Sequence, residues 1–249
     1  MYIGINIMED RYQRLKEILN NSKSIVFFTG AGISTASNIP DFRSANGLYN
    51  EKHHLYRPEE IISHHFFISH TEEFYEFYLS KMVFPNALPN LAHTYIAELE
   101  KENPNVYVVT QNIDNLHQLG GSKNVIELHG SVFRNYCMNC HKFYSLDDIL
   151  KFKGNIPKCP KCGGTIKPDV VLYEESLKED DINKAIDVIS HAETLVVIGS
   201  SLVVYPAASF IRYFRGKHLI CINKEETQYE AFCELVFHED IIKVIKEIE

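Results

Sequence analysis

The sequence predicts an α/β fold built on a doubly wound, mostly parallel sheet. Short apolar runs with the length of buried strands recur along the chain, segments with helical spacing lie between them, and a glycine turn directly follows the first run, as in a dinucleotide-binding βα unit. Two stretches, residues 46–88 and 131–168, break this alternation. We therefore expect one sheet domain, formed by residues 1–45, 89–130 and 169–249, that carries two insertions.

The chain begins with a predicted helix and a predicted strand. Apolar residues at helical spacing over 9–19 indicate the helix, and the run 24–29 (SIVFFT) indicates a buried strand. Gly30, Ala31 and Gly32 follow this strand at once. Small residues at such a turn would let the backbone approach a pyrophosphate, and the helix start after it would supply free N–H groups.

The alternation continues over the rest of the sheet domain. Strands are predicted at 106–110, 125–128, 194–198, 218–222 and 235–237, and helices at 91–100, 180–190 and 240–248. Residues 194–211 carry no charge, but their Gly, Ser and Pro favour a buried strand followed by a loop over a membrane span.

The two insertions differ in composition. Residues 46–88 are rich in His, Phe and Tyr and predict a helical module whose aromatic residues form a core. Residues 131–168 hold two Cys-x-x-Cys pairs, and each pair would present two thiolates to one ion, so they predict a ribbon around a closed, structural zinc site. Redox dithiols are the alternative. The predicted zinc ligands are Cys137, Cys140, Cys159 and Cys162, whereas Cys221 and Cys233 lie in apolar runs typical of core residues.

Composition argues against several classes of function. The chain has 249 residues, of which 45% are hydrophobic, and this length buries a core without disulfides. Its 25 Lys and Arg against 33 Asp and Glu give a net charge of −8, which disfavours a nucleic acid held by its phosphates. The first residues lack the cationic start and apolar run of a signal peptide. We expect a cytoplasmic, monomeric enzyme without a membrane partner.

Polar motifs follow three of the predicted strands. Residues 29–43 read TGAGISTASNIPDFR, residues 110–114 read TQNID, and residues 128–130 read LHG. Ligands of an open parallel sheet bind at the carboxyl ends of its strands, so we expect these motifs to meet in one site.

With these motifs the sequence closely resembles the sirtuins, the NAD-dependent protein deacylases, in their bacterial form. The resemblance covers essentially the whole chain and includes GSSL at 199–202, VYPAA at 204–208 and an Asn at position 223. It implies a Rossmann-like domain, a small zinc-ribbon domain and a helical module, with NAD and an acyl-lysine peptide or protein bound between them. The implied reaction transfers the acyl group from lysine to ADP-ribose and releases nicotinamide, and we expect a deacetylase.

The resemblance also assigns roles to individual residues. His129 is the implied general base, since a neutral imidazole can deprotonate a ribose hydroxyl, and Asn112 is placed with it in catalysis. The implied substrate contacts are Val170, Val171 and Leu172, which would pair with an extended peptide, and Tyr78 and Lys81 at the acyl pocket. The implied NAD contacts are Gly30, Ala31, Gly32, Thr35, Phe42, Arg43, Gln111, Ile113, Asp114, Gly199, Ser200, Ser201, Asn223, Glu239 and Asp240.

A few positions depart from the family pattern. Asn38 replaces a usual Gly, and Asn tolerates the left-handed backbone that such a turn needs. In the peptide-binding strand, Leu172 replaces an aromatic residue and Glu174 replaces a Gly. Sirtuins that remove succinyl or malonyl groups carry Tyr-x-x-Arg in the acyl pocket, whereas residues 78–81 end in Lys, which lacks the bidentate fork of Arg.

Several alternatives stay open at this point. A desuccinylase or demalonylase would use Lys81, and a mono-ADP-ribosyltransferase would pass ADP-ribose to another nucleophile. A nucleic-acid-binding zinc ribbon is disfavoured because residues 131–168, although locally basic, lack a ladder of stacking aromatic residues. Outside the resemblance, a histidine that follows a strand, such as His129, is more often structural than catalytic.

Overall fold

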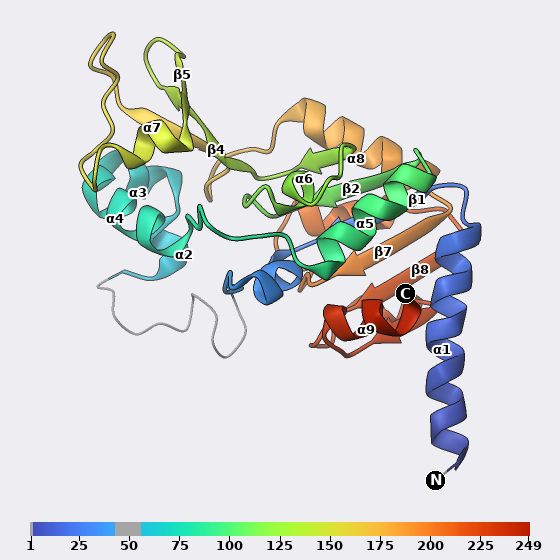
Figure 1. Ribbon diagram of the computed structural model, residues 1–249. Helices are drawn as coiled ribbons and strands as arrows, with labels where there is room; N and C mark the ends of the chain where they lie inside the picture. Colours follow the sequence, from blue (N-terminus) through green and yellow to red (C-terminus); the bar gives the residue numbers. More distant parts are fainter. Residues whose placement is uncertain (1, 43–55) are drawn as a thin grey trace.

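The computed structural model describes residues 2–42 and 56–249. Figure 1 shows a larger lobe around one sheet and a smaller lobe beside it. The sheet of the larger lobe has six parallel strands in the order β3-β2-β1-β7-β8-β9. The strands are β1 (Ile25–Thr29), β2 (Val106–Thr110), β3 (Val125–Glu127), β7 (Thr194–Ile198), β8 (His218–Ile222) and β9 (Leu235–Phe237). The predicted doubly wound parallel sheet is thus confirmed.

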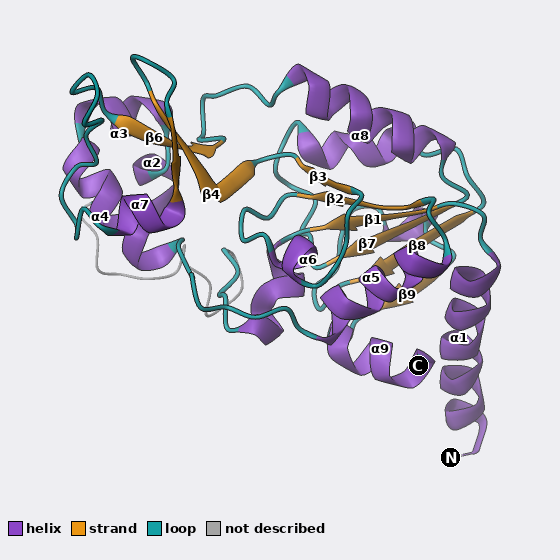
Figure 2. Ribbon diagram, turned by 45° about the horizontal axis from the view of Figure 1, so that its top comes forward, coloured by secondary structure: helices purple, strands orange, loops and turns teal. Residues whose placement is uncertain are grey.

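Helices cover both faces of this sheet (Figure 2). One face packs against α1 (Tyr2–Asn21), α5 (Leu91–Glu102) and α9 (Ile241–Ile248), and the other packs against α8 (Glu179–His191) and the 3-10 helix η3 (Ala207–Tyr213). Successive strand residues point to opposite faces, so Phe27 joins the first core and Phe28 joins the second. Both are buried, because a sheet with helices on both sides has no solvent face.

The smaller lobe contains described residues from both stretches that break the alternation in the sequence. Its antiparallel sheet has the order β5-β4-β6, with β4 (Gly130–Cys137), β5 (Phe143–Ser145) and β6 (Ile166–Val170). Beside it in Figure 1 lie α2 (Pro58–Ile61), α3 (His64–Ser69), α4 (Thr71–Lys81) and α7 (Leu146–Leu150). Phe74 and Tyr75 of α4 share one core with Ile149 and Ile166 of the ribbon. The Tyr75 hydroxyl also donates to the Ile166 carbonyl. Helices and ribbon therefore form a single packed unit.

The sheet order reverses between β1 and β7, and the loops after these two strands pack tightly together. Gly30 N donates to Ile198 O at 3.0 Å, and Gly32 N donates to Gly199 O at 2.9 Å. Gly199 has a φ of +58°, and a Cβ there would lie 2.5 Å from Ile33 N. A side chain at position 199 would force the loops apart, which explains why the turn is made of glycines.

The segment after this turn is a 3-10 helix, η1 (Ala31–Ser37), where the sequence predicted the start of an ordinary helix. It ends at Asn38, which has a φ of 61° and donates its N–H to the carbonyls of Ser34 and Thr35. The expected left-handed turn at Asn38 is therefore present.

Three short elements complete the larger lobe. They are α6 (Leu116–Leu119), η3 and η4 (Glu230–Phe232). The prediction of a loop after β7 is wrong in part, because Ala207, Ala208, Phe210 and Ile211 bury their side chains and wind into η3. Among the described residues, no helix is both long and apolar enough to span a bilayer.

Candidate functional site

A cavity of about 600 Å³ opens at the carboxyl ends of the parallel strands, where the sheet order reverses. This is the place where open α/β sheets bind dinucleotides. The sequence-predicted residues that line it are Gly30, Ala31, Gly32, Thr35, Phe42, Gln111, Asn112, His129, Gly199, Ser200, Ser201, Asn223, Glu239 and Asp240. The structure therefore brings most of the predicted NAD contacts together, although Arg43 lies outside the described residues.

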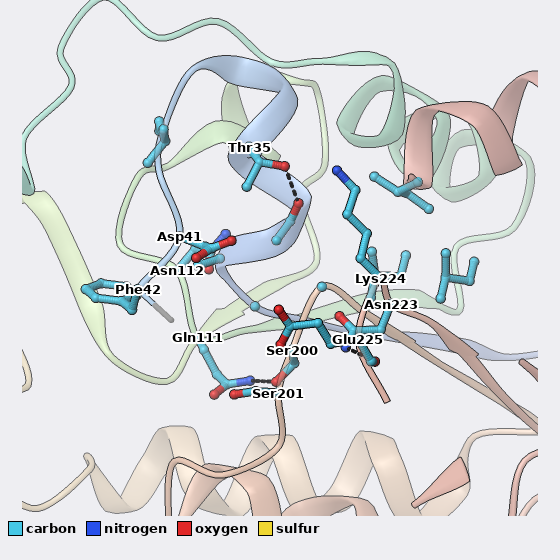
Figure 3. A pocket seen from close by; sticks show the side chains of 18 of the residues that line it. Thr35, Asp41, Phe42, Gln111, Asn112, Ser200, Ser201, Asn223, Lys224 and Glu225 are labelled. Carbon is cyan, nitrogen blue, oxygen red and sulfur yellow. Dashed lines mark hydrogen bonds between the residues drawn. The ribbon is translucent and has the colours of Figure 1, made fainter. Parts of the chain in front are cut away.

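Polar side chains on two sides of this cavity are held in place (Figure 3). Gln111 Nε2, after β2, donates to Ser200 Oγ at 2.8 Å, and so links the ends of two strands that are not neighbours. After the neighbouring strand β8, Asn223 Nδ2 donates to Glu225 O at 2.7 Å. Asp240 caps α9 by accepting from Ile242 N at 2.9 Å. These amides and hydroxyls are the donors and acceptors that ribose and phosphate groups require.

Some lining residues were not singled out in the sequence. Lys224 and Glu225 border the first cavity, and Lys224 Nζ pairs with Asp240 Oδ2 at 2.8 Å. No motif marks them, because only the parallel register of β8 and β9 brings the two strand ends together. The one sequence signal for this side of the cavity is Asn223, which immediately follows a predicted strand.

A second cavity of about 210 Å³ adjoins the first and reaches between the two lobes. Met82 and Ile62 of the helical module line one side, and Val170, Val171 and Leu172 line another. The residues shared by both cavities include Ala31, Phe42, Gln111, Asn112 and His129. The two cavities thus meet at His129, and the second is the more apolar of the two, whereas the first mixes apolar and polar side chains.

His129 is oriented by a backbone carbonyl. Its Nδ1 lies 2.9 Å from Gln111 O and donates to it, because a carbonyl can only accept. This bond leaves Nε2 as the nitrogen that can accept a proton. Burial lowers the pKa of the imidazole below its ordinary 6.5, and the bond to Gln111 opposes that shift only in part. The ring is therefore neutral near pH 7, as a general base must be.

Ser34 connects two further polar residues at the junction of the cavities. Its Oγ donates to Asp114 Oδ2 at 2.7 Å and accepts from Asn112 Nδ2 at 3.1 Å. Asp114 Oδ1 accepts from Leu116 N at 3.0 Å. Burial raises the pKa of the Asp114 carboxyl, whereas these hydrogen bonds lower it. Asn112 and Asp114 are thus fixed in orientation before any ligand binds.

The predicted substrate strand lies directly beside His129. Val171 N donates to His129 O at 3.0 Å, and Tyr173 N donates to Ile62 O at 3.0 Å, so this segment connects both lobes. Glu174 occupies a left-handed conformation with a φ of 75°. Its carboxylate accepts from His65 N at 2.9 Å, at the start of α3, and this bond offsets the strain of a side chain at a position where Gly is usual.

The two predicted acyl-pocket residues lie in different places. Lys81 lines the second cavity. Tyr78 is fully buried, stacks on Phe74 and does not line either cavity. Helical spacing explains this position, because residues four apart in α4 share the face that packs into the small-lobe core.

The four paired cysteines form a compact cluster in the ribbon, at the end of β4 that is remote from His129. Their sulfur atoms all lie within 4.8 Å of one another. Cys137 Sγ is 3.4 Å from Cys162 Sγ, and Cys140 Sγ is 3.6 Å from Cys159 Sγ. Zinc with Zn–S bonds of about 2.3 Å separates its tetrahedral ligands by about 3.8 Å. The four thiolates therefore fit one zinc ion and would leave it no open position.

Comparisons with known proteins agree with this geometry. Residues 30–206 match the model of the Sir2 family. The chain is 56% identical to an NAD-dependent protein deacetylase of Clostridium perfringens, over 97% of this chain and 99% of that protein. It is 54% identical to an NAD-dependent protein deacetylase of Clostridium acetobutylicum, over the same shares of the two chains.

Solved structures give the same result. A Sir2 structure with a p53 peptide and NAD⁺ is 40% identical and has a TM-score of 0.83, with 94% of this chain and 95% of that chain covered. A second Sir2 structure, bound to a propionylated peptide, is 39% identical and has a TM-score of 0.84, with 96% and 97% covered.

Proposed function

The chain belongs to the Sir2 family, and from this premise we propose how its residues perform NAD-dependent deacetylation of protein lysines. The observation that carries the proposal is the meeting of the two cavities at His129. Bound NAD supplies an ADP-ribosyl group that takes the acyl group from lysine as nicotinamide leaves. His129, with its free Nε2, accepts the proton of a ribose hydroxyl.

The other residues bind and orient. Gln111 and Ser200, linked to each other, border the cavity that would hold NAD. Asn112 and Asp114, fixed by Ser34, would hold the end of NAD nearest His129. Residues 170–172 would pair with an extended acyl-lysine peptide as an added strand. The zinc ion would stabilise the ribbon and take no part in the reaction.

One observation favours a second candidate substrate. Lys81 borders the second cavity, so its ammonium could attract the carboxylate of a succinyl or malonyl group. We rank this below deacetylation because the rest of that lining is mainly apolar and because Lys offers a point charge rather than a fork.

Product analysis tests both. The protein is incubated with NAD and with acetyl-, succinyl- and longer-acyl-lysine peptides, and the products are separated by mass. We expect nicotinamide, free lysine peptide and acetyl-ADP-ribose, all lost in His129→Ala. ADP-ribose attached to protein would indicate a transferase instead. If succinyl peptide reacts faster, and Lys81→Ala removes only that activity, the substrate ranking is wrong.

Three further proposals concern the molecule as a whole. We propose that it acts as a monomer in the cytoplasm, and light scattering on the purified protein tests the oligomeric state. We propose that the small lobe is formed by residues 46–88 and 131–168, of which residues 46–55 lie outside the described part of the chain. The shared core of the helices and the ribbon supports that division.

A further inference from the structure

At the two ends of the ribbon the chain crosses between the lobes, and both of these crossings carry site residues. It leaves the larger lobe between the end of β3 at Glu127 and the start of β4 at Gly130, so that His129 lies on the crossing. It returns between the end of β6 at Val170 and the start of α8 at Glu179, so that the substrate strand lies on the crossing back. The distance from base to peptide therefore depends on how the two crossings are held relative to each other.

A chain of charged side chains joins both crossings. Arg134 on β4 donates from Nη1 to Glu127 Oε2 at 2.6 Å and from Nε to Asp169 Oδ2 at 2.9 Å. Lys178, the residue before α8, donates to both oxygens of Asp169, at 2.8 and 2.9 Å. Gln118 Nε2 fixes the other oxygen of Glu127 at 3.0 Å. One guanidinium thus connects the end of β3 to the strand that leads to the substrate segment.

The carboxylates of this network are mostly withdrawn from water. The side chains of Glu127 and Asp169 are 10% and 14% exposed, whereas Arg134 is 35% exposed. A carboxylate in such a position needs a cationic partner, because water cannot fully solvate it. Arg134 supplies that partner to both at once, with the fork geometry that Lys cannot reproduce.

The bridge spans an interruption of the sheet. β4 and β6 pair at Gly130 with Val170 and at Ser131 with Asp169, and then next at Asn135 with Pro168. The register slips between Ser131 and Asn135, so the backbone ladder between them is broken. Bulges of this kind loosen and bend a strand pair. Arg134 lies inside this gap and reaches Asp169 with its side chain where the ladder is broken.

We propose that Arg134 is a positioning residue for the deacylation reaction, which holds the substrate strand in register with His129 by bridging Glu127 and Asp169. This inference rests on the proposed function only because it takes an acyl-lysine peptide as the ligand of the substrate strand. It assigns to Arg134 an effect on the peptide and not on NAD, because the first cavity is bordered by strand ends of the larger lobe.

Steady-state kinetics with an acetyl-lysine peptide and NAD test this role in Arg134→Met and in the nearly isosteric Asp169→Asn. We expect the KM for the peptide to rise about tenfold in Arg134→Met and about fivefold in Asp169→Asn, within the range of energetic coupling through such networks. The KM for NAD should stay within about twofold of its original value. Arg134→Lys should give an intermediate peptide KM, because Lys reaches one carboxylate at a time.

The matched control is Arg14→Met. Arg14 also donates twice to a carboxylate, to Glu234 Oε1 at 3.1 and 2.8 Å, but on the far side of the larger lobe. It should leave both KM values unchanged. A loss of folded protein would instead lower kcat without moving either KM, and that result in Arg134→Met and Asp169→Asn would overturn the proposal. Equal rises in both KM values would overturn it as well.

A binding measurement separates this inference from the proposed function. Fluorescence anisotropy with a labelled acetyl-lysine peptide gives the peptide Kd without turnover. If the unmodified chain released no acetyl-ADP-ribose, the proposed function would fail, yet the Kd of Arg134→Met would still decide the positioning role. An unchanged peptide Kd in folded Arg134→Met contradicts it, and a Kd raised about tenfold supports it.

Discussion

Ser34→Ala removes a single hydroxyl group, yet we expect it to destabilise the protein strongly. The side chain is 1% exposed, and its Oγ serves two partners at once, as donor to Asp114 and as acceptor from Asn112. A hydrogen bond to a charged group contributes about 1.5–3 kcal/mol and a neutral one about 0.5–1.5 kcal/mol. The free energy of unfolding should therefore fall by about 2–4 kcal/mol.

Ser37→Ala is the matched control. Ser37 lies on the same 3-10 helix and is 7% exposed, but its Oγ makes one neutral contact, from Asn90 Nδ2 at 3.0 Å. That amide also donates to Ile33 O at 2.8 Å and so keeps a partner in the variant. The expected cost is about 0.5–1 kcal/mol.

The cost of Ser34→Ala should depend on pH. Burial already raises the pKa of Asp114, and the lost donor raises it further. The lost bond stabilised the ionised carboxylate, so the difference from Ser37→Ala is full above the pKa of Asp114 and shrinks as pH falls through it. Urea unfolding followed by far-ultraviolet circular dichroism, at intervals from about pH 8 down to about pH 4, measures this. The reasoning is refuted if both variants lose the same free energy of unfolding, or if the difference between them does not change with pH.

Three more predictions follow from the site and the small lobe. His129→Ala should lower kcat by about 10²–10⁴-fold, and full activity of this variant in product analysis would contradict the assignment. In the unmodified protein kcat/KM should rise with pH through a pKa below 6.5 and then level off, because the neutral imidazole is the active form. Elemental analysis should find one zinc per chain, and its removal by a chelator should abolish activity and reduce helicity; folded, active protein without zinc would exclude the site. Glu174→Ala should lower the melting temperature more than Glu174→Gly, because both variants lose the bond to His65 but only Gly relieves the strain of the left-handed backbone. Calorimetry measures the two melting temperatures, and the reverse order would show that the strain is absent.

Local signals were enough to predict the parallel strands. Runs such as IVFFT over Ile25–Thr29 are buried at every position, and a strand covered on both faces needs an unbroken apolar sequence. The carboxyl ends of these strands then had to meet, so the motifs that follow them could be placed in one site. The zinc ligands were equally predictable, because two short turns fix the spacing of four thiolates.

Other features depend on contacts between distant residues and left no local pattern. The strands of the ribbon pair with a slipped register between Ser131 and Asn135, which no periodicity in β4 indicates. Tyr78 matched a family motif by position, yet its side chain faces the small-lobe core because Phe74 shares its helical face. Arg134 and Asp169 were counted only as charges, since their pairing appears when β6 returns beside β4.

The shared core of the small lobe has a consequence for protein synthesis. The helices α2 to α4 leave the ribosome well before the ribbon that completes their core, because α5, β2, α6 and β3 lie between α4 and β4 along the chain. Until residues as late as Leu172 have emerged, Phe67 and Phe74 lack the ribbon side chains that complete their core. Exposed aromatic side chains on a nascent chain favour aggregation. The nascent chain is therefore expected to be prone to aggregation from the emergence of α4 until the ribbon completes this core.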